Sequence, residues 1–294
     1  MPGGAMGEPA RSAVVIISER TEAAEVLRRM AVLETHRDEP FPFWRGRLAG
    51  RDVWLVVCLM GKVNAAMTAQ AAVERFRPAA ILICGSAGGL HPDILPGDLV
   101  ISTHAAQHDA GMNWGNRFVT LGVQFRHNGR IGLRRRFPAD PSLLAAAQEA
   151  ARALPHDGHG RPPQVHAGLI VTGDQAVFSR QRRQAILETW QALAVDMESA
   201  AVAQVAAAHS IPWLAVRGIS DLADEDAGLD AGLLAGSLDD EGLGAWLSLQ
   251  GRRLRYILRH PDTPWRVSRL MQGTRLAAAR ATALAEAILS HWRG

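Results

Sequence analysis

The feature that most constrains this fold is the alternation of short apolar runs with alanine-rich or amphipathic segments over residues 13–220. Such alternation is typical of a layered α/β domain with helices on both faces of a largely parallel sheet. Residues 104–140 are polar and predict loops, and residues 193–220 predict a strand end, a helix and a final strand. The other expected strands are 13–18, 52–60, 79–90, 97–103 and 166–174, and the other expected helices are 21–34, 61–76, 143–154 and 180–190.

Composition excludes several classes of protein. The 294 residues are 48% hydrophobic, which suits one sizeable α/β domain with an appendage. The formal net charge is only +3 and aromatic residues are scarce, so we expect no nucleic-acid partner. No apolar run reaches the roughly 18 residues of a membrane helix, and the N-terminus lacks the pattern of a secretory signal. We therefore expect a cytoplasmic protein.

Cysteine and histidine give no sign of a metal site or a disulfide framework. Cys58 and Cys84 lie far apart in apolar runs, which predicts two buried thiols. His104 and His108 have the i, i+4 spacing of a helical zinc motif, but the glutamate of HExxH is missing. We expect neither a metal nor a resident cofactor.

Charged residues interrupt the apolar stretch 193–224, and they include Glu198 and Asp221. In open α/β sheets, ligands bind where strands end, which is where both residues fall. Glu198 near a helix start could accept hydrogen bonds from the two vicinal hydroxyls of a ribose, or it could simply complement the helix dipole. Asp221 among apolar groups could hold a proton near neutral pH and donate it, or it could cap a following helix. Ser220 and Arg217 could orient Asp221.

Two further strand exits, and the residue before Glu198, also carry candidates. "CGSAGG" (84–89) offers small residues that let a ligand approach, although a tight turn explains the same letters, and it lacks the GxGxxG and P-loop patterns. Glu22 starts the first expected helix and could polarise a water, or it could be a surface glutamate. Met197 could pack under a sugar or belong to the core.

Five stretches, quoted in chain order, carry a family resemblance: "MGKVNAAMTAQ", "ILICGSAGGLHPDILPGDLVIS", "QHDAG", "GLIVTGDQAVF" and "AVDMESAAVAQVAAAHSIPWLAVRGISDLAD". With them the chain resembles the nucleoside phosphorylase and nucleosidase superfamily, especially the methylthioadenosine/S-adenosylhomocysteine nucleosidases. The resemblance implies a three-layer α/β/α sandwich with a twisted mixed central sheet, plus a C-terminal helical extension. It implies a catalytic domain over 12–224, followed by an acidic loop and an arginine-rich helical extension over 225–294, and at least a dimer.

The resemblance also implies roles. Asp221 would be the general acid that protonates the purine, and Glu198 would hold the ribose hydroxyls. Glu22 would activate water, with Glu25 as a competing alignment. The substrate-binding residues it implies are Ser86, Ala87, Gly88, Val177, Phe178, Met197, Arg217 and Ser220.

Two departures from the family leave the nucleophile open. "IISERTE" replaces the small-residue entry usual in nucleosidases, which bears on water activation. The arginine-containing phosphate loop of phosphorylases is missing at "CGSAGG". Arg130 or the cluster Arg134–Arg136 could substitute for it, or these arginines could form a solvated face. Hydrolysis and phosphorolysis, with phosphate as co-substrate, both remain open.

The segment after residue 225 differs in composition from the rest of the chain. An acidic, glycine-rich loop precedes three expected amphipathic helices over 243–260, 263–276 and 277–292. This arginine-rich segment resembles the hopanoid-associated phosphorylases, which implies adenosylhopane as a candidate substrate. Residues 251–280 could contact an anionic membrane peripherally, or they could pack on the domain or at a dimer contact.

Together these observations predict an enzyme that cleaves the N-glycosidic bond of a 5′-substituted adenine nucleoside and releases adenine. Adenosylhopane is one candidate substrate. Methylthioadenosine or S-adenosylhomocysteine is the alternative, and a nucleoside-binding module without catalysis is the alternative from another class.

Overall fold

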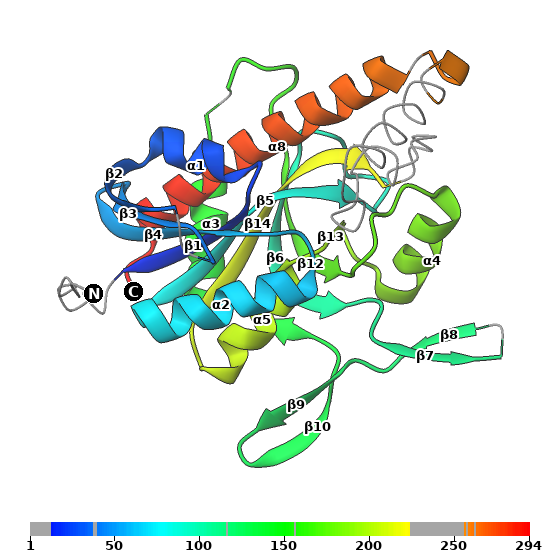
Figure 1. The fold of residues 1–294 in the computed structure, drawn as a ribbon, viewed down its shortest axis with the longest axis horizontal. Coiled ribbons are helices and arrows are strands. Elements are labelled where there is room, and N and C mark those ends of the chain that lie inside the picture. The colour runs from blue at the N-terminus through cyan, green and yellow to red at the C-terminus, as the bar shows by residue number, and fades with distance from the viewer. Residues whose placement is uncertain are drawn as a thin grey trace, which may run out of the picture.

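A computed structural model describes residues 13–37, 40–115, 117–155, 157–223, 256, 258–261 and 263–294. It confirms a three-layer α/β/α sandwich around a mixed sheet (Figure 1). The ten strands of the sheet are β1 (Val14–Glu19), β2 (Ala31–His36), β3 (Phe43–Leu48), β4 (Arg51–Cys58), β5 (Ala80–Gly89), β6 (Leu99–Gln107), β11 (Phe137–Pro138), β12 (Val165–Thr172), β13 (Ala194–Asp196) and β14 (Trp213–Leu222).

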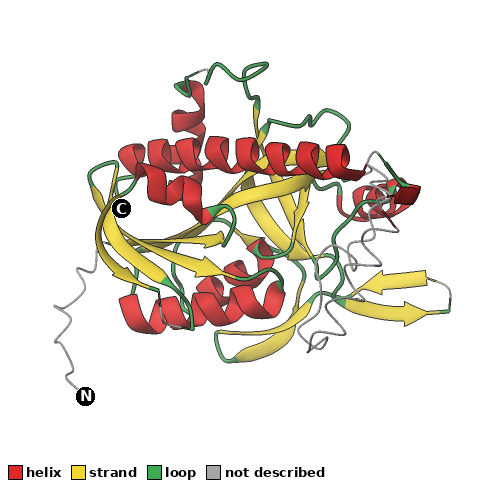
Figure 2. Ribbon diagram, turned by 45° about the horizontal axis from the view of Figure 1, so that its top comes forward, coloured by secondary structure: helices red, strands yellow, loops and turns green. Residues whose placement is uncertain are grey.

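The helices form the two outer layers (Figure 2). α2 (Lys62–Phe76) and α5 (Ser199–Ala208) cover one face, while α1 (Ala23–Arg29), α3 (Pro141–Arg152) and α8 (Thr263–His291) cover the other. α4 (Arg180–Trp190) follows β12. α3 shows why such helices form. The Asp140 side chain accepts the backbone N–H groups of its first turn, and one face buries Leu143, Ala146, Ala147 and Ala150.

The sheet closes on itself around β5. Strand β1 lies parallel to both β4 and β5, in the middle of the sheet. β5 also pairs with β14 in parallel and with β13 in antiparallel orientation. Because β14 pairs with β6, β6 with β12, and β12 with β13, five strands form a ring. Gly88 of β5 therefore lies opposite both Val195 and Asp221.

The structure corrects two expectations for the secondary structure of residues 21–140. The helix expected over 21–34 ends at Arg29, and residues 31–36 form β2, because they pair with the unpredicted strand β3 and tertiary pairing overrides helical spacing. The expected loop 104–140 contains two hairpins, β7 (Gly111–Trp114) with β8 (Arg117–Thr120), and β9 (Val123–His127) with β10 (Arg130–Arg134). Their outer residues are largely exposed, so they lack the apolar signal of core strands.

The C-terminal segment also differs from its prediction. Residues 263–276 and 277–292, expected as two helices, form the single helix α8. An arginine in an amphipathic helix is expected on the polar face, but Arg280 is only 4% exposed. Its guanidinium donates to Asp157 and to the carbonyl of Gly97. The acidic loop and most of the helix expected over 243–260 lie outside the described residues. Among the helices that the structure describes, none is long and apolar enough to cross a membrane.

α8 packs closely on β14, the strand that carries Arg217 and Asp221. A side chain added at Gly218 would place its Cβ 2.5 Å from the carbonyl carbon of Ala277. A Cβ added at Gly273 would lie 2.5 Å from the carbonyl oxygen of Ser220. Both glycines allow the helix backbone to contact the strand, and Gly273 is accommodated inside α8 for this reason.

We predict that Gly218→Ala lowers the free energy of unfolding by about 1–3 kcal/mol, because the added methyl group collides with backbone atoms that cannot move independently. Urea denaturation followed by circular dichroism measures this change. Gly132→Ala is the matched control, since nothing lies within 4 Å of a Cβ at that exposed hairpin position. Equal stability of the two variants would contradict close packing of α8 on β14.

Candidate active site

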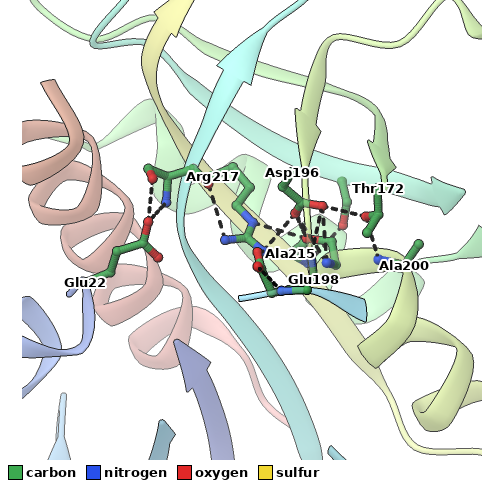
Figure 3. Close-up of polar contacts among 11 residues, drawn as sticks. Glu22, Thr172, Asp196, Glu198, Ala200, Ala215 and Arg217 are labelled. Carbon is green, nitrogen blue, oxygen red and sulfur yellow. Dashed lines mark hydrogen bonds and ion pairs between the residues drawn. The ribbon is translucent and has the colours of Figure 1, made fainter. Parts of the chain in front are cut away.

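Four predicted site residues meet at the carboxyl ends of the central strands, and Figure 3 labels three of them, Glu22, Glu198 and Arg217. Glu22 follows β1, Ser86 lies in β5, Arg217 lies in β14, and Glu198 immediately precedes α5. The topology brings these segments together because β1, β5 and β14 run parallel and adjacent. This end of the sheet is where ligands bind in open α/β folds.

The buried guanidinium of Arg217 is the centre of this cluster. Its Nη2 atom lies 2.8 Å from Asp196 Oδ2 and 3.4 Å from Glu198 Oε2. Its Nε donates to Ser199 Oγ at 3.1 Å, and its Nη1 donates to the carbonyl of Ser86 at 3.3 Å. Burial alone would lower the pKa of Arg217, but the surrounding carboxylates outweigh burial and raise it. The guanidinium therefore stays charged.

Asp196 fixes the start of α5. It accepts hydrogen bonds from the hydroxyls of Thr172 and Ser199 and lies 3.4 Å from the backbone nitrogen of Glu198. Thr172 Oγ1 in turn accepts the backbone N–H of Ala200 at 2.9 Å. Asp196 thus holds Glu198 and Arg217 in place together. The sequence alone indicates no role for Asp196.

Glu198 occupies the N-cap position of α5 but makes no capping bond with its side chain. Its Oε1 accepts the backbone N–H of Gly61 at 3.2 Å, and its Oε2 faces Arg217. The carboxylate therefore points away from its own helix, unlike a glutamate that only complements the dipole. Burial, together with the nearby charges of Asp196 and Glu22, raises the pKa of Glu198 to about 7, although Arg217 opposes the shift.

Glu22 faces the cluster, whereas the competing Glu25 does not. Glu22 Oε1 accepts the backbone N–H of Ser86 at 2.8 Å and also its hydroxyl. Its Oε2 is buried and has no hydrogen-bond partner among the described residues. Burial raises the pKa of Glu22, and Arg217 counteracts part of this rise. Glu25 is also buried, but its carboxylate pairs with Arg28 of the same helix.

The small residues of "CGSAGG" make room for these side chains. A Cβ added at Gly85 would lie 2.7 Å from Arg217 Nη1 and 2.8 Å from the carboxyl carbon of Glu22. A Cβ added at Gly88 would lie 3.5 Å from Asp221 Oδ1. Glycine at 85 is required for the approach of Glu22 and Arg217, which a simple tight turn would not explain.

Asp221 lies on the other side of β5 from Glu22. It is half-buried, and Ser220 Oγ donates to its Oδ2 at 2.6 Å. Ser220 Oγ is also 3.3 Å from the carbonyl oxygen of Ala87. Asp221 and Glu198 are thus both tied to the end of β5, Asp221 through Ser220 and Ala87, and Glu198 through Arg217 and Ser86.

For the remaining predicted substrate-binding residues, the structure gives burial and neighbours. Met197 is half-buried next to Glu198, and Ala87 is buried in β5. Val177 packs in a separate apolar cluster that also contains Trp190, and Phe178 is half-buried just before α4. The substrate-binding roles of Val177 and Phe178 therefore stay predictions.

A second ionic network supports Glu198 and was missed from the sequence. Lys62 Nζ lies 2.6 Å from Asp109 and 3.6 Å from Asp174, and the backbone N–H of Asp174 donates to Asp109 at 2.9 Å. The network ties the start of α2, next to Gly61, to the segments after β6 and β12. In the sequence, the one feature that points to this network is that Lys62 is the single lysine of the chain, but composition alone gives that lysine no role.

His104 lies within β6 and His108 just after it, so the i, i+4 spacing of this pair is not helical. Burial lowers the pKa of His108 to about 4, so its ring is neutral, and its Nδ1 lies 3.3 Å from Arg182. Among the residues that the structure describes, no group of three histidine, cysteine or carboxylate side chains could hold a metal ion.

Comparisons with known proteins identify the family of this chain. A family model described as the phosphorylase superfamily matches residues 12–240. A 5′-methylthioadenosine/S-adenosylhomocysteine nucleosidase of Mycobacterium bovis is 32% identical, over 76% of this chain and 85% of its own length. One of Bacillus thuringiensis is 33% identical, over 73% of this chain and 87% of its own length.

Solved structures extend the comparison to the fold. The nucleosidase of Neisseria meningitidis, solved with methylthio-immucillin-A, has a TM-score of 0.69 at 26% identity, covering 96% of this chain and 99% of that one. The futalosine hydrolase of Helicobacter pylori, with a TM-score of 0.69, covers 95% of this chain and 97% of its own but is 22% identical, so it supports the fold alone. The chain therefore belongs to the phosphorylase superfamily, as an enzyme of the nucleosidase type.

Proposed function

We propose that this enzyme hydrolyses the N-glycosidic bond of a 5′-substituted adenine nucleoside and releases adenine. The observation that carries the proposal is the convergence of Glu22, Glu198 and Asp221 on the end of β5. A nucleoside offers three matching groups: an anomeric carbon for water, two ribose hydroxyls and a purine N7. The names of the nucleosidase relatives support the same substrate class.

Each carboxyl group has a distinct part in the proposed reaction. Asp221 donates a proton toward the purine N7, which neutralises the departing base. Ionised Glu198 accepts hydrogen bonds from the two ribose hydroxyls while the sugar acquires the character of an oxocarbenium ion. Glu22, whose Oε2 lacks a partner among the described residues, accepts a proton from the water that attacks the anomeric carbon. The new bond joins that water oxygen to the sugar as the bond to the base breaks.

Arg217 and Ser86 serve as positioning residues in this scheme. Arg217 holds Glu198 and the backbone of Ser86, and Ser86 holds Glu22. Met197, next to Glu198 and half-buried, would contact the apolar face of the sugar.

We predict that Asp221→Asn lowers kcat for adenine release by about 10²–10⁴-fold, because the amide cannot donate the required proton. Asp93→Asn, at a highly exposed carboxylate outside the cluster, is the matched control. Base release is followed by chromatography and folding by circular dichroism. Undiminished turnover would exclude Asp221 as the acid, and calorimetric nucleoside binding without any release by the wild type would favour a binding module instead.

A second prediction concerns pH. Since the pKa of Glu198 is raised to about 7, the carboxylate is protonated below that pH and accepts ribose hydroxyls poorly. We expect kcat/KM to rise as pH increases through about 7. Glu198→Gln should lack this limb and lose roughly 10–100-fold in kcat/KM, the value of hydrogen bonds to a charged group. Glu188→Gln, on an exposed face of α4, should keep the wild-type profile. Persistence of the limb in Glu198→Gln would assign it to another group.

We further propose adenosylhopane as a candidate substrate, with 251–280 as a peripheral membrane contact. In its described part, α8 exposes Trp265 and Met271 beside several arginines, as expected of a helix at an anionic interface. The buried portion of α8 around Arg280 supports packing on the domain for that part of the segment. Cytoplasmic localisation and a homo-oligomer stay predictions.

A substrate panel tests the nucleophile and the 5′ substituent together. Methylthioadenosine, S-adenosylhomocysteine, adenosylhopane in mixed micelles and inosine are each incubated with and without phosphate. We expect adenine release from 5′-substituted adenosines at a rate that phosphate leaves unchanged, with free sugar as the second product. Formation of a sugar 1-phosphate would assign phosphorolysis instead, and failure of adenosylhopane alone would leave the smaller nucleosides as substrates.

A further inference from the structure

A cavity of about 870 Å³ lies between α1, α8 and residues 154–155 and 157–163, apart from the candidate active site. α1 contributes Glu25, Arg28 and Arg29, which share one helix face by their i, i+3 and i+4 spacing. α8 contributes a stripe that includes Arg275, next to the face that packs on β14. Neither Glu22, Glu198 nor Asp221 lines this cavity. Its volume is typical of a small-molecule site.

The cavity wall has an excess of positive charge. Its lining holds four arginines against two carboxylates. Arg280 is buried and saturated by Asp157 and by backbone carbonyls, so it shapes the wall but cannot bind a ligand. Arg28 pairs with Glu25 and remains largely exposed. Arg29 pairs with Glu286, which lies outside the lining.

Arg275 is the remaining arginine of the cavity wall, and its charge is not balanced by a carboxylate of the lining. It is exposed, and none of its contacts within the described residues is an ion pair or a hydrogen bond. A guanidinium has five N–H donors in a planar fork that matches a carboxylate or phosphate. An anion in the cavity would meet Arg275 first and share the outward N–H groups of Arg28 and Arg29.

The rest of the lining is aliphatic. Leu154, Pro155, Leu276 and Ala279 present hydrocarbon surface between the charged groups. Among the lining residues, His159 has the only aromatic ring, so a flat base would find little to stack on. Hydrocarbon walls with guanidinium groups on two sides suit a ligand that has an aliphatic body and one anionic end.

We propose that this cavity is a second binding site, which takes an amphiphilic anion: an aliphatic chain that ends in a phosphate or a carboxylate. The anionic end binds Arg275 and Arg28, and the chain lies against Leu276 and Ala279. Nothing in this assignment depends on the nucleosidase reaction, since the two sites share no lining residue among those described.

Calorimetry with decyl phosphate below its micellar concentration tests the assignment. We expect it to bind at least about tenfold more tightly than inorganic phosphate or decanol, because each of these lacks one half of the recognition. Decanoate should bind as well. Equal affinity for decyl phosphate and inorganic phosphate, or no binding of decyl phosphate, would overturn the proposal.

Two charge-matched double variants locate the site. Arg28→Ala/Arg275→Ala should weaken decyl phosphate at least about tenfold. Arg117→Ala/Arg126→Ala, which removes two exposed arginines from the hairpins, should leave it unchanged. Equal weakening in both pairs would show attraction by net charge only and would contradict a built site.

Hydrogen exchange gives an independent readout that needs no variant. Decyl phosphate should slow exchange in peptides that cover residues 25–29 and 272–283. Slower exchange around Ser86 and Glu198 instead would place the ligand in the active site and overturn the proposal.

Discussion

The structure of the site depends on one buried cation among carboxylates. Arg217 is 2% exposed, and Asp196, Glu198 and Glu22 surround it. Removing ions from water costs several kcal/mol for each ion, so these charges are tolerable only because every one is paired or hydrogen-bonded. A structural core of this size would be served as well by apolar residues. The arrangement is therefore better explained by chemistry at the end of β5 than by stability.

One arginine cannot neutralise three carboxylates, so its charge does not fully offset the effect of burial on Glu198 and Glu22. Asp196 lies nearest the guanidinium and is saturated by hydroxyl and amide donors, so it takes most of that charge. Glu198 lies farther from the guanidinium, and Glu22 is linked to it through Ser86. Burial raises the pKa of both glutamates. A glutamate with a raised pKa is a stronger base for water, and one that ionises near neutrality can respond to its ligand.

The sequence was sufficient where local pattern decides structure. The buried strands β1 and β5 and the convergence of Glu198, Ser86 and Arg217 follow from apolar runs that end in polar residues. Tertiary pairing decided the rest. Residues 31–36 form an edge strand only because β3 lies beside them. The amide of Gly61 meets Glu198 across 137 residues, a contact that depends on strand order rather than on any motif.

The continuity of α8 follows from the same dependence on close contact. Glycine destabilises a helix interior, yet the missing side chain of Gly273 lets α8 lie against the backbone of Ser220. Two residues before Ser220, the missing side chain of Gly218 in turn leaves room for the backbone of Ala277 in α8. The strand that carries Arg217 and Asp221 is thus fixed by backbone contacts with α8 and by the ion pairs and hydrogen bonds of Arg217 in the charged cluster. Because these backbone atoms are in close contact, displacement of α8 would also displace Ser220, whose hydroxyl orients Asp221.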